Sequence, residues 1–224
     1  MERFNRLLLL ITWLIVVCSA RAYALEGKNT HFYFGSFEGH VQINEDPNRS
    51  EWQKPDKVVD YLLIKNGDTV ADIGAGTGYF TVLFSKKVGE NGKVYAVDVE
   101  KTMLDYIKAR TEKEGLHNIV EVLSKPDDPL LPKSSVDLIF ICYTYFDLKN
   151  NGNYLNMLKD VLKKGGRLAI VEEQLTSKRD KPPLHKRTAK EKVSEDALNA
   201  GFKLDAEFYF LPYQYFLIFS KEQG

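Results

Sequence analysis

Short apolar runs alternate with helical segments through the middle of this chain. The runs "DTVADIG", "KVYAVDV" and "VDLIFIC" are almost continuously apolar, and segments with helical spacing separate them. Strands that are buried on both faces read as continuous apolar runs, whereas a sheet with one solvated face would alternate. The pattern therefore predicts an α/β fold in which helices cover both faces of a mostly parallel sheet.

The expected elements can be placed along the chain in order. A helix begins near Pro55, because proline suits a first helical turn. The elements that follow are a strand over 68–74, a helix over 79–88, a strand over 93–99, a helix over 102–114, strands over 118–123 and 136–142, a helix over 154–163 and a strand over 167–173.

The C-terminal stretch over 202–221 departs from this alternation. It offers two aromatic β runs separated only by Leu211 and Pro212. So short a link cannot hold a crossover helix, so the two strands are expected to be antiparallel neighbours. The predicted fold is a doubly wound, mostly parallel sheet that ends in an antiparallel hairpin.

Length and charge exclude several classes of protein. The chain has 224 residues, 44% of them hydrophobic, which suffices for one well-buried domain and is short for two. Its 31 basic and 31 acidic residues cancel, so the attraction that draws a protein to nucleic acid is missing and no nucleic-acid partner is expected. Two cysteines are too few for a disulfide framework, and no histidines have metal-ligand spacing, so no metal site is expected.

The beginning of the chain has the layout of a secretory signal peptide. Arg3 and Arg6 precede an apolar run over 7–17, and the small residues Ala22 and Ala24 follow. A run of about eleven residues is short for a membrane span, which needs roughly 20. Cleavage after Ala24 is the first choice and cleavage after Ala22 the second. We expect an exported, periplasmic protein, and a membrane anchor through residues 7–17 is the alternative.

The chain divides into three expected segments. Residues 1–24 form the signal peptide, residues 25–50 form an N-terminal arm, and residues 51–224 form the folded domain. The arm contains "HFYFGSF" and "NEDPNRS" and shows no sustained helical or strand period. We therefore expect the arm to be irregular.

The string "DIGAGTGY" over residues 72–79 lies between a strand and a helix. Glycines there permit positive φ and lack a Cβ, so a ligand can approach the backbone at the free N–H groups of the helix start. The dinucleotide fingerprint G-x-G-x-x-G would need a glycine where Tyr79 stands. Asp98 ends the next strand, where a carboxylate can accept hydrogen bonds from ribose hydroxyls. A nucleoside without a pyrophosphate fits this turn best.

At these residues the sequence resembles the class I S-adenosylmethionine-dependent methyltransferases. The stretch "VADIGAGTGYF...GKVYAVDV" is similar to their first two motifs, and "LPKSSVDLIF", "LKDVLKKGGRLAIVEE" and "ALNAGFKL" follow in the expected order. The resemblance covers roughly residues 50–220 and is strongest to small bacterial proteins with the type 11 domain, including quinone-biosynthesis-like relatives. It implies a Rossmann-like, seven-stranded sheet whose last strand runs antiparallel.

The resemblance implies a binding site for S-adenosylmethionine. Asp72 and the glycine turn would hold its methionine end, and Asp98 would hold the ribose. Asp127 stands where the family carries an acid near the adenine, although Asp128 is as plausible by residue type. Val99 is expected to pack against either the adenine or the core. The full implied set is Asp72, Gly74, Ala75, Gly76, Gly78, Asp98, Val99 and Asp127. A solvated acid, a helix cap and a plain turn are the alternative roles.

Methyl transfer from a sulfonium depends mainly on positioning, because the methyl group is already electrophilic. The stretch "ICYTYFDL" leaves the carboxyl edge of the sheet, where ligands bind in open α/β folds. Tyr143 and Tyr145 are candidates for orienting the acceptor or contacting the sulfonium, and Asp147 is a candidate base. Aromatic packing and helix capping explain these residues equally well. The resemblance also places Trp52 near the cofactor.

We expect a methyltransferase whose acceptor is a small, largely apolar or aromatic molecule, because the segments flanking the expected mouth are rich in rings. One alternative is an exported module that binds S-adenosylmethionine or a nucleoside without turnover. Another is an exported interaction protein that keeps the fold for its surface. Export favours both alternatives, because the cofactor is made in the cytosol. The glycine turn together with Asp98 disfavours the interaction protein.

Overall fold

The computed structural model describes residues 37–180 and 182–221. The chain forms two compact units, Met1–Gly39 and His40–Gly224, and the fold described below is that of the second unit. The expected signal peptide lies outside the described residues, as does the first half of the expected arm.

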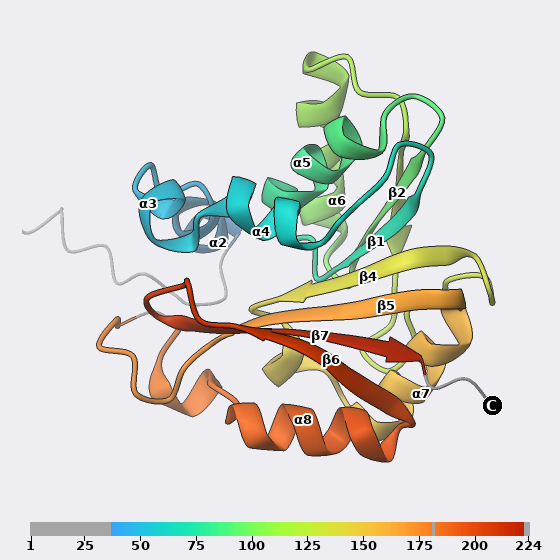
Figure 1. The fold of residues 1–224 in the computed structure, drawn as a ribbon. Coiled ribbons are helices and arrows are strands. Elements are labelled where there is room, and N and C mark those ends of the chain that lie inside the picture. The colour runs from blue at the N-terminus through green and yellow to red at the C-terminus, as the bar shows by residue number, and fades with distance from the viewer. Residues whose placement is uncertain (1–36, 181, 222–224) are drawn as a thin grey trace, which may run out of the picture. The chain divides into compact units, whose positions relative to one another are not determined.

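The second unit is built on a seven-stranded sheet with the strand order β3-β2-β1-β4-β5-β7-β6 (Figure 1). Neighbouring strands among β1 to β5 pair in parallel, and β7 pairs antiparallel with both β5 and β6. The predicted mostly parallel sheet with an antiparallel last strand is confirmed. The strands are β1 Thr69–Ile73, β2 Lys93–Asp98, β3 Ile119–Leu123, β4 Val136–Cys142, β5 Leu162–Glu173, β6 Phe202–Phe208 and β7 Gln214–Lys221.

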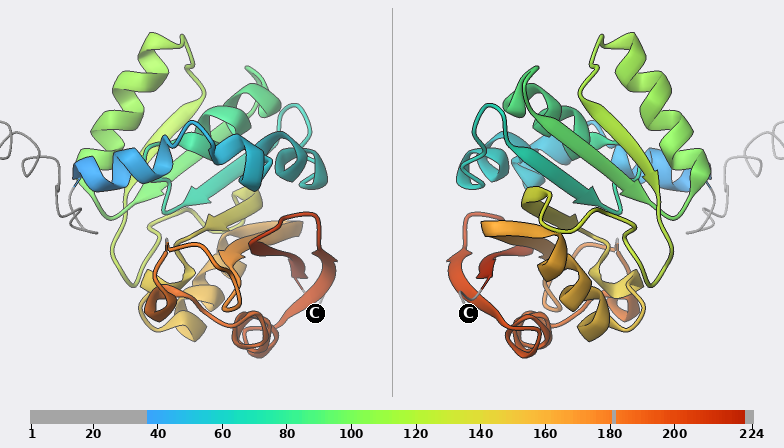
Figure 2. Two further views of the ribbon diagram at one scale, coloured as in Figure 1. Left: turned by 90° about the vertical axis from the view of Figure 1, so that its left-hand side faces the viewer. Right: turned by 90° about the vertical axis from the view of Figure 1, so that its right-hand side faces the viewer.

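Helices cover both faces of this sheet. Figures 1 and 2 show α4, α5 and α6 on one side and α7 and α8 on the other. No helix within the described ranges has the length and apolar character needed to cross a membrane. The helices are α2 Phe37–Asn44, α3 Arg49–Gln53, α4 Pro55–Tyr61, α5 Tyr79–Val88, α6 Lys101–Lys113, α7 Asn151–Val161 and α8 Lys190–Asn199, with 3-10 turns η1 Tyr145–Asp147 and η2 Leu184–Lys186.

Strand β4 shows why the central strands are almost continuously apolar. Its side chains alternate between two cores, because successive residues of a strand point to opposite faces. Leu138 and Phe140 pack under α4 and α5, whereas Ile139 and Ile141 pack under α7 and α8. All four side chains are fully buried. A strand between two helical layers therefore has no polar face.

The expected irregular arm over 25–50 is corrected in its described part, because α2 and the start of α3 lie within it. Polar contacts hold this segment. The guanidinium of Arg49 donates to the Asn44 carbonyl at 2.7 Å, and Arg110 forms an ion pair with Glu45 at 2.8 Å. Such contacts leave no hydrophobic period in the sequence, so the pattern did not indicate a helix.

Candidate active site

The turn between β1 and α5 contains three glycines in the left-handed region. The φ angles of Gly74, Gly76 and Gly78 are 71°, 56° and 78°, which residues with a Cβ rarely adopt. A Cβ on Gly74 would lie 2.1 Å from Thr144 Oγ1, and one on Gly76 would lie 2.9 Å from Asn44 Nδ2. The turn needs glycine for its conformation and for space, and it forms a cradle that a side chain would fill.

Asp98 ends β2 beside this turn, and its side chain is buried. The Gly76 N–H donates to Asp98 Oδ2 at 2.9 Å, and the Glu100 N–H donates to Oδ1 at 2.9 Å. Burial raises the pKa of Asp98, and these two N–H groups oppose that rise. Each carboxylate oxygen keeps a second lone pair. Asp98 therefore has the chemistry to accept hydrogen bonds from two adjacent ribose hydroxyls.

Asp72 lies in β1 just before the turn, and its carboxyl group is buried. The Thr81 hydroxyl donates to Asp72 Oδ2 at 2.6 Å. Burial raises the pKa of Asp72 to about 7, against the opposing effects of the Thr81 hydrogen bond and the Arg49 cation. Asp72 therefore changes charge near neutral pH.

The adenine side of the expected site is more open. Val99 and Asp127 are exposed, and Ala75 is buried. Asp128 is half-buried. Burial raises the pKa of the Tyr154 hydroxyl, and the negative charges of Asp128 and Asp98 raise it further. Asp127 and Asp128 both lie between β3 and β4, and Asp128 is the less exposed of the two.

Tyr143 is the first residue after β4, and its hydroxyl group lies in a polar cluster. Tyr143 has a φ of 57°, and its hydroxyl donates to Glu173 Oε2 at 2.6 Å. Arg179 Nη1 donates to the same hydroxyl at 3.1 Å. The Arg179 guanidinium lies 3.4 Å from the ring centroid of Trp52, and the Trp52 and Tyr143 centroids are 6.4 Å apart. We call Trp52, Tyr143, Glu173 and Arg179 the ring cluster.

The sequence matches the ubiE/COQ5 methyltransferase family over residues 48–191. The chain belongs to this family. Its cofactor is S-adenosylmethionine, and the glycine cradle and the free lone pairs of Asp98 fit that group. The prediction of a class I methyltransferase is confirmed. The alternative of a binding module without turnover is not favoured.

Two relatives show how far the likeness extends. The ubiquinone/menaquinone biosynthesis C-methyltransferase UbiE of Escherichia coli is 32% identical over 115 residues, which are 51% of this chain and 46% of that protein. The matched part of this chain therefore spans less than half the length of the curated relatives. The crystal structure of an S-adenosylmethionine-dependent methyltransferase from Aquifex aeolicus is 30% identical with a TM-score of 0.78, over 83% of this chain and 98% of that one.

The fold alone does not determine the reaction. The [4+2]-cyclase SpnF has a TM-score of 0.65 and 14% identity, over 77% of this chain and 81% of that one. It therefore shares the fold while its name describes another chemistry. The activity of the present chain rests on its family and on its site residues.

The structure corrects the expectation that Tyr145 of this methyltransferase orients an acceptor. Tyr145 is fully buried under α7 and α8, and its hydroxyl donates to Asp196 Oδ2 at 2.8 Å. The ring therefore stabilises the core on the face opposite to α4 and α5. Asp147 is exposed, with a carboxylate oxygen 3.8 Å from Lys186 Nζ. No described hydrogen bond or ion pair joins Asp147 to Tyr143.

Glu172 is a positioning residue that the sequence did not reveal. Its buried Oε1 accepts the N–H groups of Thr144 at 2.9 Å and Tyr145 at 2.8 Å, which fixes the loop after β4. Burial raises the pKa of Glu172 to about 8, although both N–H groups oppose the rise. The signal in the sequence was the pair of acids that ends the apolar run "RLAIVEE".

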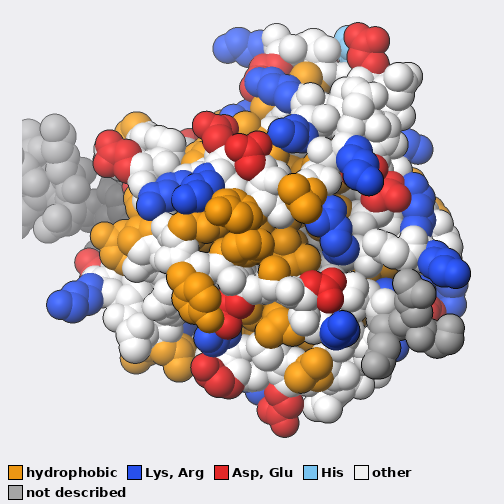
Figure 3. Space-filling view, in the orientation of Figure 1, with side chains coloured by type: hydrophobic (Ala, Val, Ile, Leu, Met, Phe, Trp, Pro, Cys, Tyr) orange, Lys and Arg blue, Asp and Glu red, His pale blue; other side chains and the backbone are white. Residues whose placement is uncertain are grey.

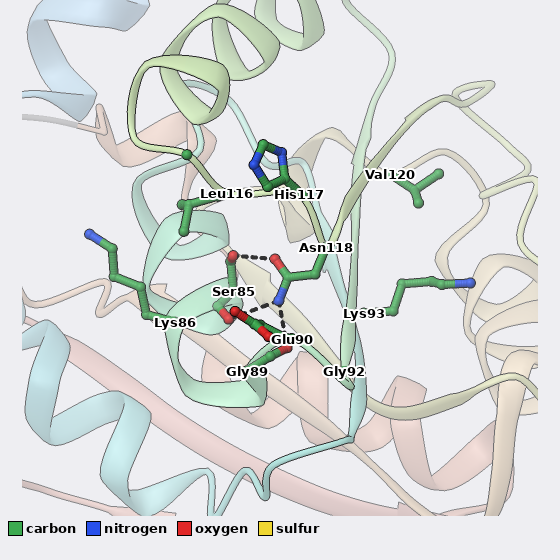
Figure 4. A pocket seen from close by; sticks show the side chains of 11 residues that line it. Ser85, Lys86, Gly89, Glu90, Gly92, Lys93, Leu116, His117, Asn118 and Val120 are labelled. Carbon is green, nitrogen blue, oxygen red and sulfur yellow. Dashed lines mark hydrogen bonds between the residues drawn. The ribbon is translucent and has the colours of Figure 1, made fainter.

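A cavity of about 610 Å³ lies at the other edge of the sheet, by the first residues of β2 and β3 (Figure 4). The Asn118 side chain lines this cavity and donates to the carbonyls of Ser85 at 3.0 Å and Gly89 at 2.8 Å. Ligands of open α/β folds bind at the carboxyl ends of the strands, and this cavity is at the amino ends. We therefore place the methyltransferase site at the glycine turn and not in this cavity.

Proposed function

We propose that this methyltransferase transfers the methyl group of S-adenosylmethionine to a small, flat, largely apolar acceptor that bears a hydroxyl group. The acceptor would lie between the glycine turn and the ring cluster. The observation that carries this proposal is the Trp52–Tyr143 ring pair, with centroids 6.4 Å apart, at the carboxyl end of β4. Aromatic walls with a few polar groups orient a flat molecule and exclude water.

The ring cluster is coupled to the cofactor cradle through the chain itself. Tyr143 and Thr144 are consecutive, and Thr144 lies against Gly74 in the glycine turn. A left-handed backbone costs a residue such as Tyr143 about 1–2 kcal/mol. Its hydroxyl contacts with Glu173 and Arg179 help to hold this conformation. A strained residue held by its surroundings beside a ligand site supports a functional role for its ring.

The residues of the cluster have distinct proposed roles. Burial and the neighbouring Glu173 keep the pKa of Tyr143 well above its ordinary value, so the phenol remains protonated and can orient an acceptor but not accept its proton. Arg179 is ion-paired with the buried Glu173 at 3.3 Å, and its guanidinium lies beside the rings, where its remaining N–H groups could donate to an acceptor hydroxyl. When bound, S-adenosylmethionine supplies an electrophilic methyl group, so the protein contributes mainly alignment.

The name of the Escherichia coli relative supports a carbon atom of a quinol-type ring as the methyl acceptor. The balance of 31 basic against 31 acidic residues supports a small molecule over a nucleic acid, which would require a basic stripe. These two observations and the ring cluster favour the same class of acceptor.

A labelled-methyl transfer assay tests the proposal. The full chain would receive radiolabelled S-adenosylmethionine with hydroxylated benzene and naphthalene rings that carry short apolar tails, and separately with RNA and DNA. We expect label on a hydroxylated ring. Greater transfer to nucleic acid, falling steeply with added salt, would contradict the proposal.

A pair of variants locates the acceptor. Trp52→Ala should lower kcat/KM for the ring substrate at least about tenfold, in the range of one lost aromatic contact, and leave S-adenosylhomocysteine affinity unchanged. Tyr61→Ala is the matched control. Tyr61 stacks with Phe210 at 5.1 Å among apolar side chains gathered on the surface over α4 and the β6–β7 hairpin (Figure 3), outside the ring cluster. Equal losses in both variants would refute the placement.

A further inference from the structure

Gln214 is a buried glutamine whose side chain has no described partner. It is the first residue of β7 and is 1% exposed. Among the residues that the structure describes, neither its Nε2 nor its Oε1 has a hydrogen-bond partner. A polar group that is buried without a partner costs free energy, so buried polar side chains are generally hydrogen-bonded. The position of Gln214 therefore calls for a polar group that the described residues do not supply.

The pairing of β5 with β7 places this side chain beside the ring cluster. Gln214 lies opposite Glu173 in the antiparallel register, and such opposite residues point to the same face of the sheet with Cβ atoms roughly 5 Å apart. The alternation along each strand agrees with this placement. Val171 and Phe216, two residues away along their strands, both pack in the core under α4 and α5. Gln214 therefore lies next to the ring cluster, of which Glu173 is a member.

Glu173, unlike its neighbour Gln214, has its hydrogen bonds within the protein. Its Oε2 accepts from the Tyr143 hydroxyl at 2.6 Å and from Arg179 Nη1 at 3.3 Å. The Ser177 hydroxyl donates to its Oε1. The charge of Glu173 is balanced by its ion pair with Arg179, whereas Gln214 is neutral and has two N–H donors and a carbonyl oxygen. This part of the cluster therefore presents a neutral hydrogen-bonding position to a ligand.

We propose that Gln214 is a specificity-determining residue that binds a neutral oxygen, a hydroxyl group or a ring carbonyl, at the end of the acceptor remote from the methylated atom. β7 lies three strands from β1 and neighbouring strands are about 4.8 Å apart, so Gln214 lies roughly 14 Å from the strand that leads into the glycine turn. A hydroxyl group can donate to Oε1, and either kind of oxygen can accept from Nε2. This proposal rests on the proposed function and adds a second oxygen to the acceptor.

Arg179 is the side chain that an acceptor would displace to reach Gln214, which is closed off from solvent. The Arg179 side chain is 21% exposed. Its guanidinium lies 3.4 Å from the ring centroid of Trp52 and 5.6 Å from that of Tyr213, the residue before Gln214. A guanidinium is planar and stacks on aromatic faces, so a flat ring can take its place against the same side chains. The polar end of that ring would then lie next to Gln214.

Two methionine variants test whether Gln214 lacks partners within the fold. Methionine is unbranched, similar in length to glutamine and able to fill irregular gaps, so Gln214→Met should raise the midpoint of urea denaturation by removing an unpaired polar group. Gln53→Met is the matched control, because the buried Gln53 accepts from Arg49 Nε and donates to Cys142 Sγ at 3.2 Å. That variant should lower the midpoint. A lowered midpoint in Gln214→Met would show that the folded chain uses this side chain, and it would overturn the proposal.

A pair of ring acceptors tests the recognition of the remote oxygen. The two rings share one skeleton, and only the first carries a hydroxyl group remote from the methylated atom. The ratio of their kcat/KM values should be at least about tenfold larger in the unmodified protein than in Gln214→Met. The change should appear in KM, because the contact is the same in the ground state and the transition state. Each ring has the same intrinsic reactivity in both proteins, so the change in ratio isolates the contact with Gln214.

The outcomes separate this proposal from the proposed function. Transfer to both rings, with the same ratio in both proteins, would overturn the role of Gln214 and leave the proposed function standing. Absence of transfer to either ring would overturn the proposed function and this proposal with it. The methylated products, used as inhibitors of the unmodified protein, give an answer even if Gln214→Met does not fold. The product with the remote hydroxyl group should inhibit at least about tenfold more strongly, and equal inhibition constants would overturn the proposal.

Discussion

Thr144 lies directly against Gly74, with its Oγ1 only 2.1 Å from the point where a Cβ on Gly74 would stand. The two residues follow β4 and β1, which are paired neighbours in the sheet. This contact joins the loop that carries the ring cluster to the turn that cradles the cofactor. The loop after β4 and the glycine turn are therefore packed against each other.

We expect Gly74→Ala to destabilise the protein by about 2–4 kcal/mol, from overpacking against Thr144 and from left-handed strain. Gly115→Ala is the control, because Gly115 has a φ of 66° and no atom lies within 4 Å of the point where its Cβ would stand. That variant should lose only the strain of about 1 kcal/mol. Urea denaturation measures both losses, and equal values would contradict the close contact between Thr144 and Gly74.

Glu172→Gln should change the pH dependence of stability. The pKa of Glu172 rises from an ordinary 4.5 to about 8 in the folded protein, so the native state binds more protons than the unfolded state between these values. Stability of the unmodified protein therefore falls as pH rises through this window. Glutamine keeps the acceptor for Thr144 and Tyr145 and does not ionise, so the variant should not suffer this loss. Its stability relative to that of the unmodified protein should therefore rise between pH 5 and pH 8, by up to about 1.4 kcal/mol for each pH unit.

Glu172→Leu is the counterpart, because it removes the acceptor as well as the charge. Relative to Glu172→Gln, it should cost about 1–3 kcal/mol for each of the two N–H groups left unsatisfied, at every pH. Denaturation curves at pH 5 and pH 9 distinguish the two variants. If Glu172→Gln lost as much stability as Glu172→Leu at pH 9, the two hydrogen bonds would not be the function of this residue.

Cofactor binding should be linked to a proton on Asp72. With a pKa of about 7, part of the population is protonated at pH 7, and an ammonium group on the ligand favours the ionised form. S-adenosylhomocysteine should therefore bind more tightly as pH rises from 6 to 8 and release a fraction of a proton at pH 7. Calorimetry in two buffers of different ionisation enthalpy measures this release. If Asp72→Asn still released a proton on binding, the proton would come from another group.

We also propose that the chain is exported and cleaved after Ala24. The basic start, the apolar run over 7–17 and the small residues before the cut support this. N-terminal sequencing of protein made in a secretion-competent bacterium should begin at Leu25. A product that begins at Met1 and stays in the cytosol would refute export.

The sheet could be predicted because each strand carries its own signal. The run over 136–142 is apolar except for Asp137, and its bounds are those of β4. The predicted ends of helices and strands were less accurate where the terminal residues are polar. Helix α7 begins at Asn151 instead of Tyr154, and β5 begins at Leu162 instead of Arg167, because strand pairing and capping extend beyond the apolar residues.

The glycine turn and Asp98 could be predicted because strand, turn and helix are contiguous in the sequence. The residues that contact the site from other parts of the chain could not be predicted from the sequence. Arg179 reaches the Tyr143 hydroxyl from a segment 36 residues further along the chain, and no local period marks it. Tyr143 and Tyr145 contact different parts of the protein because β4 ends at Cys142, Tyr143 has a φ of 57° and Tyr145 begins the 3-10 turn η1. A two-residue spacing would otherwise have placed both rings on one side.

The central claim is that Asp98 and the glycine turn hold the cofactor at the carboxyl edge of the sheet, and calorimetric titration with S-adenosylhomocysteine tests it most directly. The unmodified chain should bind at one site, and ligand at 100 times its dissociation constant should add about 2.7 kcal/mol of stability. Asp98→Ala should bind at least about tenfold more weakly while its sheet remains folded. Absence of binding to the unmodified chain, or unchanged binding by folded Asp98→Ala, would contradict the account.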